Sequence, residues 1–529
     1  MLAGELMFHF LLTVIITAIV ATFVLWRYRV VVLKGMSFAS GEPVAITPRA
    51  MTHAPSAPAA AGDSAALAWE RAMHRRAICA WLITVAVPAP LIAVAYLSGE
   101  QISAATIVMA SGVILGAAVP VIAVSLGWTW KRGLLFWLEL LAAGAVLTVV
   151  ASMLQRLARG ASPSLDQLLN VLPFFQLAAV FSSIPLLLVL ASGPGRLRGV
   201  VPITFAGLLV FGLAPVLGSR ATQLLAESRA GSELLLGTIS TVGLHAAFIA
   251  FALPTGWIAW KRLQAVAREY EEKGFSDVQL LARAWWLMFI ATLALEILNK
   301  QAAPLWAVIT CAAAYPVFLV ANRHAFRWVG LAAANRVPRT LLLLRVFGYT
   351  RRTEKLFDRV GSRWRYFGPV TMIAAPDVVA RSIDPADFLY YMVGAIDENF
   401  VRSAADLQRR LQTLDTQRDP DGRFRVNDFC CADTTWRATV TALMDRADVV
   451  LMDLRGITSR QRGCEFELRE LPTRLAPQRV VLVVDNATDR TFVRGALGPA
   501  ADAVQFYEMD KPRTAATDKL FRELIRAAG

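Results

Sequence analysis

Long apolar runs separated by short basic loops are the feature that most limits what this chain can fold into. The runs reach the roughly 20 residues that an α-helix needs to cross the hydrocarbon core of a bilayer. Hydrophobic residues make up 56% of the 529 residues, which is more than an ordinary soluble protein carries. We expect about nine spans, at Met7–Trp26, Ile78–Leu97, Ala105–Trp128, Leu134–Met153, Leu169–Leu190, Val200–Leu217, Leu234–Trp260, Ala282–Leu298 and Pro304–Ala321.

The basic residues between these runs predict an orientation. If the N-terminus lies outside, the inside loops contain 15 Lys and Arg residues and the outside loops contain 5, at Arg156, Arg159, Arg220, Arg229 and Lys300. Cytoplasmic loops carry an excess of Lys and Arg. We therefore expect a plasma-membrane protein with an external N-terminus and a cytoplasmic C-terminus. Because many basic residues are explained in this way, the net charge of +14 does not indicate nucleic-acid binding.

Composition divides the chain into three parts. Residues 1–322 are expected to form the α-helical multi-pass region, in contact with the lipid bilayer. Within it, residues 37–70 are rich in Ala, Pro and Ser, which is typical of a disordered cytoplasmic linker. Residues 338–529 carry frequent charges and shorter apolar runs, and we expect them to form a separate cytoplasmic domain.

Few ionisable residues fall inside the expected spans. The candidates for an ion or substrate path among them are Glu139, His245 and Glu296. Ionisable groups within a bilayer mark ion or substrate paths, so a small-solute transporter with an accessory cytoplasmic domain stays an alternative. Glu139 and Glu296 lie toward span ends, and a histidine such as His245 is also explained by a hydrogen bond to a neighbouring helix.

In residues 338–529, continuous apolar runs alternate with segments of helical spacing. The runs are Thr340–Gly348, Pro369–Asp377, Asp448–Leu454, Gln478–Asp485 and Ala503–Asp510. Strands that are apolar on both faces and alternate with helices indicate a parallel sheet covered on both sides. The sequence therefore predicts an α/β domain with a parallel five-stranded sheet. We expect the long segment Val378–Ala432 to be an insertion that covers one rim of this sheet.

Ligand sites in open parallel sheets lie beyond the carboxyl ends of the strands. Gly348, Asp377, Asp453 with Arg455, and Asp485 stand at these ends. Glu467 lies early in the helix after the third run and shares a helix face with Cys464 and Leu471. Glu465 stands four residues before Arg469, so we interpret it as half of a surface ion pair.

Several chemistries are excluded by what the domain lacks. All five histidines (His9, His53, His74, His245 and His324) precede it, so it cannot contain a Ser–His–Asp triad or an H-E-x-x-H zinc site. The chain has no G-x-x-x-x-G-K-[ST] phosphate loop. The five cysteines match no zinc or disulfide spacing, and we interpret them as reduced. Among the chemistries considered, catalysis or binding by carboxylate side chains is the one that these absences leave open.

Two related flavodoxin-like families resemble the segment around these residues. The Toll/interleukin-1 receptor (TIR) domain has a hydrophobic strand, a polar loop with serine, and then Trp-Cys-x-x-Glu-Leu. Here Ala447–Leu454, Ser459 and Gly463-Cys464-Glu465-Phe466-Glu467-Leu468 follow that order, with Gly463 at the tryptophan position. The nucleoside deoxyribosyltransferases have an Ala-Asp-hydrophobic strand before a Gly-Thr-x-x-Glu-Leu helix start, which Ala447-Asp448 and the same segment also resemble.

Both resemblances imply cleavage of an N-glycosidic bond. A fixed carboxylate stabilises or traps the oxocarbenium-like transition state of such a reaction, and no cofactor or metal is needed. The resemblance implies that Glu467 is catalytic, that NAD or a related nucleotide is the ligand, and that the domain self-associates. We expect substrate contacts from Gly348, Asp377, Asp453, Arg455 and Cys464.

These observations favour a membrane-anchored sensor or effector whose cytoplasmic TIR-like domain cleaves or binds NAD or a related nucleotide. Whether the domain is an enzyme stays open at this point. The alternative within the same architecture is a non-catalytic signalling or assembly scaffold, in which Glu467 only supports helix packing.

Overall fold

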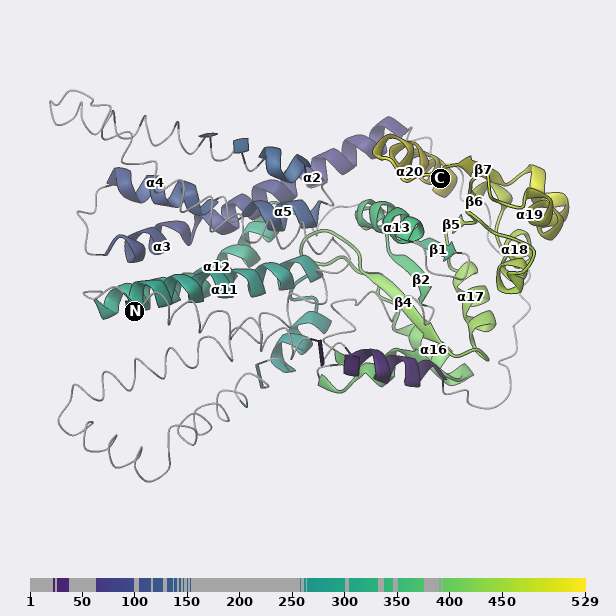
Figure 1. The fold of residues 1–529 in the computed structure, drawn as a ribbon, viewed down its shortest axis with the longest axis horizontal. Helices are drawn as coiled ribbons and strands as arrows, with labels where there is room; N and C mark the ends of the chain where they lie inside the picture. The colour runs from purple at the N-terminus through teal and green to yellow at the C-terminus, as the bar shows by residue number, and fades with distance from the viewer. Residues whose placement is uncertain are drawn as a thin grey trace. The chain divides into compact units, whose positions relative to one another are not determined.

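The structure is a computed structural model (Figure 1). It describes residues 22–23, 26–37, 63–98, 104–115, 118–126, 131–136, 138–139, 142–143, 146, 150, 153, 257, 261–262, 264–299, 304–331, 337–345, 351–374, 390–391 and 393–529. The chain divides into two compact units. The helical unit consists of residues 1–27, 78–329 and 384–393, and the sheet unit of residues 28–77, 330–383 and 394–529.

The regular elements described in the helical unit are helices. They are α3 (Ala89–Tyr96), α4 (Ala104–Leu115), α5 (Val119–Ser125), α11 (Asp277–Asn299), α12 (Leu305–Trp328) and the last part of α2 (Asp63–Ala86). Helix α12 contacts α3 and α11. Trp286 of α11 stacks on Phe318 of α12, with ring centroids 4.8 Å apart. Van der Waals contacts between closely packed side chains of this kind stabilise the association of apolar helices.

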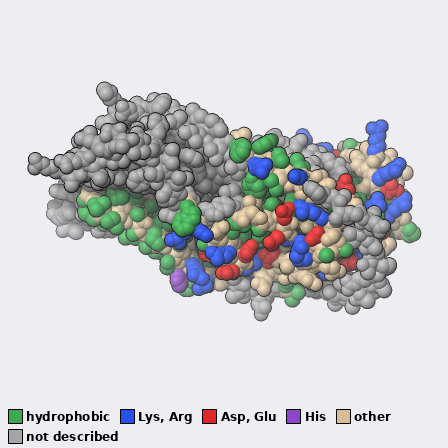
Figure 2. Space-filling view, turned by 90° about the horizontal axis from the view of Figure 1, so that it is seen from below, with side chains coloured by type: hydrophobic (Ala, Val, Ile, Leu, Met, Phe, Trp, Pro, Cys, Tyr) green, Lys and Arg blue, Asp and Glu red, His purple; other side chains and the backbone are tan. Residues whose placement is uncertain are grey.

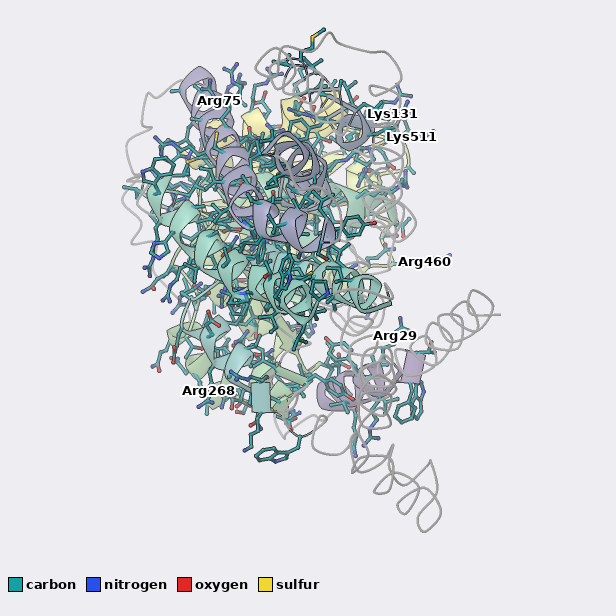
Figure 3. All side chains as sticks on the ribbon, turned by 90° about the vertical axis from the view of Figure 1, so that its left-hand side faces the viewer. Arg29, Arg75, Lys131, Arg268, Arg460 and Lys511 are labelled. Atoms are coloured by element: carbon teal, nitrogen blue, oxygen red, sulfur yellow. The ribbon has the colours of Figure 1, made fainter. Side chains whose placement is uncertain are left out.

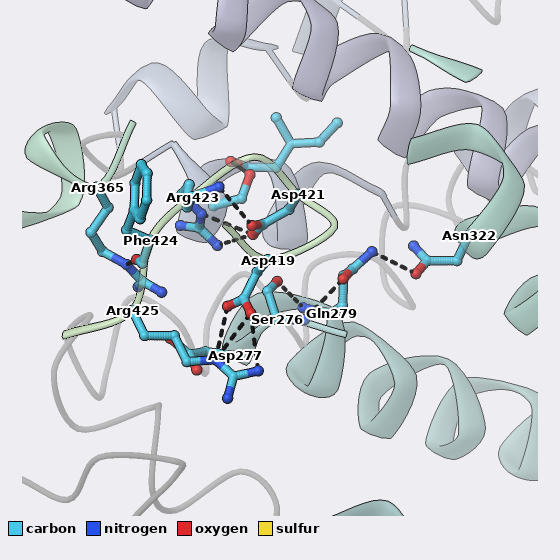
Figure 4. Close-up of polar contacts among 12 residues, drawn as sticks. Ser276, Asp277, Gln279, Asn322, Arg365, Asp419, Asp421, Arg423, Phe424 and Arg425 are labelled. Atoms are coloured by element: carbon cyan, nitrogen blue, oxygen red, sulfur yellow. Dashed lines mark hydrogen bonds and ion pairs between the residues drawn. The ribbon is translucent and has the colours of Figure 1, made fainter. Parts of the chain in front are cut away.

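One polar contact also joins α11 and α12. The side-chain amide of Gln279 donates a hydrogen bond of 3.0 Å to Asn322 Oδ1, and both residues are buried (Figure 4). Gln279 Oε1 in turn accepts from the backbone N–H of Ser276 at 2.9 Å. A polar side chain inside an apolar bundle needs such a partner, because an unpaired amide there costs free energy.

Apolar side chains are also exposed on these helices. Leu305, Ile309, Val320 and Trp328 of α12 are 70%, 59%, 59% and 80% exposed. Figure 2 shows hydrophobic side chains gathered over one part of the face in view, and acidic and basic side chains intermingled over another. Apolar patches on a soluble surface are normally small, so these helices present a surface suited to an apolar environment.

Two helical segments among the described residues are long and apolar enough to cross a membrane, Ala65–Tyr96 and Leu305–Trp328. They overlap the expected spans Ile78–Leu97 and Pro304–Ala321. The expected span Ala282–Leu298 lies within α11, and Ala105–Trp128 covers all but the first residue of α4 and all of α5. Half of the residues of the expected span Leu134–Met153 are described, and the other four expected spans lie wholly or mostly outside the described residues, so the multi-pass architecture stays a prediction.

A parallel sheet of seven strands forms the core of the sheet unit, in the order β3-β4-β2-β1-β5-β6-β7. The strands are β1 (Leu341–Arg345), β2 (Val370–Ala374), β3 (Phe400–Val401), β4 (Val426–Cys431), β5 (Val449–Asp453), β6 (Val480–Val484) and β7 (Gln505–Glu508). The prediction of a parallel α/β sheet is confirmed. The strand count was wrong, since the sheet has seven strands and not five.

Both additional strands come from the insertion Val378–Ala432. Helix α16 (Ala404–Gln412) separates β3 from β4, and β2 pairs with β4 along the whole length of β2. The described part of the insertion therefore widens the sheet beyond β2. The expected cover over the rim concerns Asp377 and neighbouring residues that lie outside the described part of the chain, and this role stays a prediction.

Helices cover both faces of the sheet. On one face, α17 (Trp436–Met444), α18 (Arg462–Arg474) and α19 (Arg490–Leu497) share a single apolar cluster with alternate residues of β1, β5 and β6. On the other face, α13 (Arg351–Trp364) and α20 (Thr514–Ala528) contact each other and the same three strands (Figure 1). Leu356, Phe357, Val360 and Trp364 form the apolar face of α13, and all four are buried.

A tight hairpin at residues 418–425 precedes β4. Arg423 pairs with Asp421 at 2.6 Å and Arg425 with Asp419 at 3.0 Å, and all four side chains are at least nine-tenths buried (Figure 4). Gly422 allows the turn, because its φ of +79° is unfavourable for a residue with a side chain. The sequence Asp-Pro-Asp-Gly at residues 419–422 forms this turn, between helix α16 and strand β4.

One boundary differs from expectation. Helix α2 begins at Asp63, so the end of the expected linker at 37–70 is helical, while residues 38–62 lie outside the described residues. At the start of helix α17, Thr435 holds the N-cap position. Residues Asp433–Thr435 form a turn before the helix, in which the N–H of Thr435 donates to the carbonyl of Ala432.

Candidate functional site

The direction of the chain connections reverses between β1 and β5. Strand β1 is followed in sequence by β2 on one side, whereas β5 and the later strands are added on the other side. Ligands in open parallel sheets bind outside the carboxyl ends of the strands at such a point. The last residues of the two strands, Arg345 and Asp453, are direct register partners. The local topology therefore places a basic and an acidic residue side by side at the expected position.

Asp453 forms a buried ion pair with Arg455. Arg455 Nη2 donates to Asp453 Oδ2 at 2.7 Å, and Arg455 Nε donates to Asp453 Oδ1 at 2.8 Å. The two side chains are 2% and 1% exposed. Arg455 Nη1 is buried and has no hydrogen-bond partner among the described residues. Buried donors are normally satisfied, so this N–H group is available for an acceptor from outside the described part of the chain.

Glu467 is buried on the inner face of α18. It shares that face with Cys464, Leu468 and Leu471, as the helical spacing predicted, and it is 4% exposed. Within the described part of the chain, its Oε2 atom has no hydrogen-bond partner. Burial raises the pKa of Glu467 to about 8, and the positive charge of Arg345 opposes that rise. At pH 7 the side chain is therefore mostly a neutral carboxylic acid.

Glu465 behaves as the sequence predicted. Arg469 Nη2 donates to Glu465 Oε1 at 2.6 Å, and the two side chains are 66% and 31% exposed. This i, i+4 pair lies on the solvated side of α18. The two glutamates of the helix therefore have different environments, although only one residue separates them.

Cys464 lies between the apolar core and the strand end. Its thiol donates to the backbone carbonyl of Arg345 at 3.8 Å, and its side chain belongs to the apolar cluster under α18. Cys464 thus connects α18 to the end of β1. This contact joins the start of the helix that carries Glu467 to the strand end. The expected contact between Cys464 and a substrate stays a prediction.

Asp485 organises the loops that follow β5 and β6. Its Oδ1 accepts hydrogen bonds from the backbone N–H of Gly456 at 3.0 Å and from the hydroxyl of Thr488 at 3.0 Å. Arg352, near the start of α13, approaches Asp485 Oδ2 at 3.4 Å. Gly456 has φ of +74°, which a residue with a side chain rarely adopts. Asp485 is therefore a structural carboxylate with its oxygens already engaged.

The structure brings four predicted residues together at the ends of β1 and β5 or on the helix beside them: Asp453, Arg455, Cys464 and Glu467. Gly348 and Asp377 lie outside the described residues. Sequence reasoning missed Arg345. The available signal was an arginine directly after four leucines in a buried strand. Charged residues are rarely buried unless they have a partner, so an arginine at this position indicates a partner or a function.

Comparisons with protein-family models, with curated proteins and with solved structures found no match to this chain. The arrangement of residues is therefore the basis for any functional conclusion.

Two buried polar atoms of opposite kind define what the arrangement can do. Arg455 Nη1 can donate to an anionic or carbonyl oxygen. The Glu467 carboxyl can donate a proton when neutral, or stabilise a positive charge when ionised. Among the described residues, no group of three or more His, Cys, Asp and Glu side chains is placed to hold a metal ion.

Proposed function

We propose that the sheet unit binds NAD or a related nucleotide at the ends of β1 and β5, and that Glu467 acts in cleaving its N-glycosidic bond. The observation that carries this proposal is the buried Glu467 carboxyl with an unpartnered oxygen at the point where the strand order reverses. A buried carboxyl without a partner destabilises the fold. Functional sites are where proteins retain such groups.

The strand order also supports a flavodoxin-like, TIR-like core. If β3 and β4 are set aside, the remaining order β2-β1-β5-β6-β7 corresponds to 2-1-3-4-5, the order of flavodoxin-like folds. The glutamate that TIR NAD hydrolases use corresponds to Glu467 in the resemblance described above. Arg455 Nη1, which has no partner among the residues that the structure describes, suits a phosphate or a ribose hydroxyl of the same ligand.

The raised pKa of Glu467 fits this chemistry in a particular way. The nicotinamide ring of NAD is positively charged, and the transition state of glycosidic cleavage develops positive charge on the ribose. A nearby cation favours the ionised form of a carboxyl group. Glu467 would therefore be mostly neutral in the resting site at pH 7 and become ionised as the ligand binds. The negative charge of Glu467 then lies close to the positive charge that develops on the ribose in the transition state.

We also propose that the sheet unit is held at the cytoplasmic side of the plasma membrane by a multi-pass helical region, so that the protein acts as a membrane-anchored sensor or effector. The two candidate spans and the exposed apolar side chains of α12 support this location. Arg29, Arg75, Lys131 and Arg268, labelled in Figure 3, come from three different predicted inside loops, and all four are exposed.

The test uses the full-length protein in lipid nanodiscs at high concentration, because TIR-like domains are expected to need self-association. NAD loss and nicotinamide release are measured for the wild type, Glu467→Gln and Glu465→Gln. The first substitution should lower turnover by roughly 10²-fold or more, since the charge at the reacting centre is lost. The second should leave turnover nearly unchanged, because Glu465 lies on the solvated face.

Two outcomes contradict the catalytic proposal. Equal loss of turnover in both variants would remove the assignment to Glu467. NAD binding without turnover in the wild type, weakened by Glu467→Gln, would instead support a domain that binds the nucleotide at this site without cleaving it.

A further inference from the structure

An apolar groove runs along α12 beside the end of α2. Its volume is about 530 Å³, within the range of roughly 300–1,000 Å³ that ligand-holding pockets occupy. The residues that line it include Ile83, Val87, Pro316, Val320, His324 and Trp328. All of them belong to the helical unit, and the groove is open on one side.

The lining of the groove excludes most classes of ligand. Apart from His324 and the indole N–H of Trp328, no side chain in the lining can form a hydrogen bond. Val87, Val320 and Trp328 are 49%, 59% and 80% exposed, so the groove presents apolar surface to its surroundings. A polar metabolite would lose its hydration here and gain no hydrogen bonds in return. The occupant must be a hydrocarbon over most of its length.

One end of the groove is basic. Arg323 and Arg327 stand directly before His324 and Trp328 in α12, and both arginines are exposed. Helix α12 contains no acidic residue. Arginine side chains are long enough to place their charge at the edge of the groove, while their stems cover apolar surface. The occupant therefore combines a hydrocarbon chain with an anionic group at one end.

We propose that this groove binds an anionic phospholipid, with one acyl chain along Val320 and Ile83 and the phosphate at Arg323 and Arg327. This inference rests on the membrane location proposed above. Basic pockets between helices on the cytoplasmic side recognise anionic head groups in this way. A second copy of the chain fits less well, because it would bring the same uncompensated arginines to the contact. Trp328 suits the level of the head groups, where tryptophan is enriched.

The site can be tested by titrating the detergent-purified full-length protein with phosphatidylglycerol or with phosphatidylcholine of the same acyl chains. Native mass spectrometry then counts the bound lipid molecules. We expect phosphatidylglycerol to bind at least tenfold more tightly. Val320→Trp should remove the bound lipid by filling the groove. The double variant Arg323→Gln/Arg327→Gln should reduce the affinity for phosphatidylglycerol to that for phosphatidylcholine.

Two matched controls use exposed residues away from the groove. Ile309→Trp adds the same bulk elsewhere on α12, and Arg71→Gln/Arg75→Gln removes two exposed charges from α2. Both should retain the preference for phosphatidylglycerol. Equal affinity for the two lipids in the wild type, or unchanged binding in Val320→Trp, would overturn the proposal. Full displacement of the lipid by glycerophosphate, which has the head-group phosphate without chains, would also overturn it.

Failure of the membrane location is a separate result. It is read from the fraction in which the unmodified protein is recovered after cell lysis, before any detergent is added. A protein recovered from the membrane fraction that shows no lipid preference refutes the groove alone. Recovery in the soluble fraction refutes the membrane location, and the groove proposal falls with it.

Discussion

Arg363 binds Glu70 through two parallel hydrogen bonds of 2.6 and 2.7 Å, although 293 residues separate them in the chain. The same guanidinium contacts Asp518 at 2.6 Å and lies over the ring of Phe521 at 4.0 Å. Glu70 belongs to α2, Arg363 to α13, and Asp518 and Phe521 to α20. One arginine thus connects the first part of α2 to the helical layer that covers one face of the sheet.

Removing this arginine should destabilise the sheet unit. Arg363→Met leaves the Glu70 carboxylate, whose side chain is 6% exposed, without a partner. Loss of one member of a buried pair costs roughly 3–5 kcal/mol. Urea unfolding of the purified full-length protein, followed by tryptophan fluorescence, measures the change. Arg469→Met is the control, because it breaks an exposed pair worth about 0–1 kcal/mol. Similar losses in both variants would contradict the central role of Arg363.

Two glycines of one segment should respond in opposite directions to the same substitution. A Cβ at Gly368 would overlap the backbone of Arg339, whose nitrogen would lie 2.6 Å away, whereas a Cβ at Gly361 within α13 meets nothing within 4 Å. We expect Gly368→Ala to lower stability by roughly 3 kcal/mol or more. Gly361→Ala should raise stability by up to about 1 kcal/mol, because alanine favours a helix. The unfolding midpoints of both variants measure these changes. A Gly368→Ala variant as stable as the wild type would refute the close approach of Gly368 to the backbone of Arg339.

The stability of the sheet unit should fall with rising pH because of Glu467. The folded-state pKa of about 8 lies above the ordinary value of 4.5, so the folded state retains a proton that the unfolded state releases. The stabilising contribution is complete below about pH 4.5 and is lost as pH rises through 8. Between these values the slope is about 1.4 kcal/mol per pH unit.

Glu467→Gln isolates this contribution. The variant lacks the titrating proton, so the free energy of unfolding of Glu467→Gln minus that of the wild type should increase from pH 5.5 to pH 8. Denaturant unfolding at several pH values measures it. Parallel curves for the two proteins would show that Glu467 titrates normally and is not buried as described.

Replacing Asp453 alone should destabilise the fold, whereas replacing Asp453 and Arg455 together should cost much less stability. Asp453→Asn leaves a buried arginine charge beside Arg345, and we expect a loss of roughly 3–5 kcal/mol. Asp453→Leu with Arg455→Met removes both charges and should recover most of that loss. If the pair also serves a ligand, the double variant will fold but lose NAD binding. Glu508→Gln, in an exposed pair with Arg490, is the control and should change stability by less than about 1 kcal/mol.

Three of the five strands predicted from sequence share one property. Leu341–Leu344, Val449–Met452 and Val480–Val484 are almost completely buried on both faces, so their sequences are continuous apolar runs. Strand β4 escaped prediction because Asn427 and Asp428 interrupt its apolar residues and its side chains are alternately half-buried at the start. Strand β3 has only two residues, too few for any periodic signal.

The candidate site was predictable in part for a similar reason. Glu467 stood out because its helical spacing placed a carboxyl with Cys464 and Leu471, and the structure buries all three. Arg345 did not stand out, because its role depends on pairing with Asp453 across more than a hundred residues. The Arg455 Nη1 group that has no partner among the described residues could not be predicted from sequence. An ion pair with Asp453 is already a sufficient reason for an arginine at this position.

The pairing of β1 with β5 also sets the order in which the sheet can assemble during synthesis. The N–H of Thr340 donates to Asp448, a residue made 108 positions later. At about 5–20 residues per second, the ribosome needs on the order of ten seconds to make this interval. During that time the leucines of β1 lack one of their two neighbouring strands, and an unpaired apolar strand edge readily associates with other chains. The newly made protein is therefore most vulnerable to aggregation at this stage, when its expected spans have already left the ribosome.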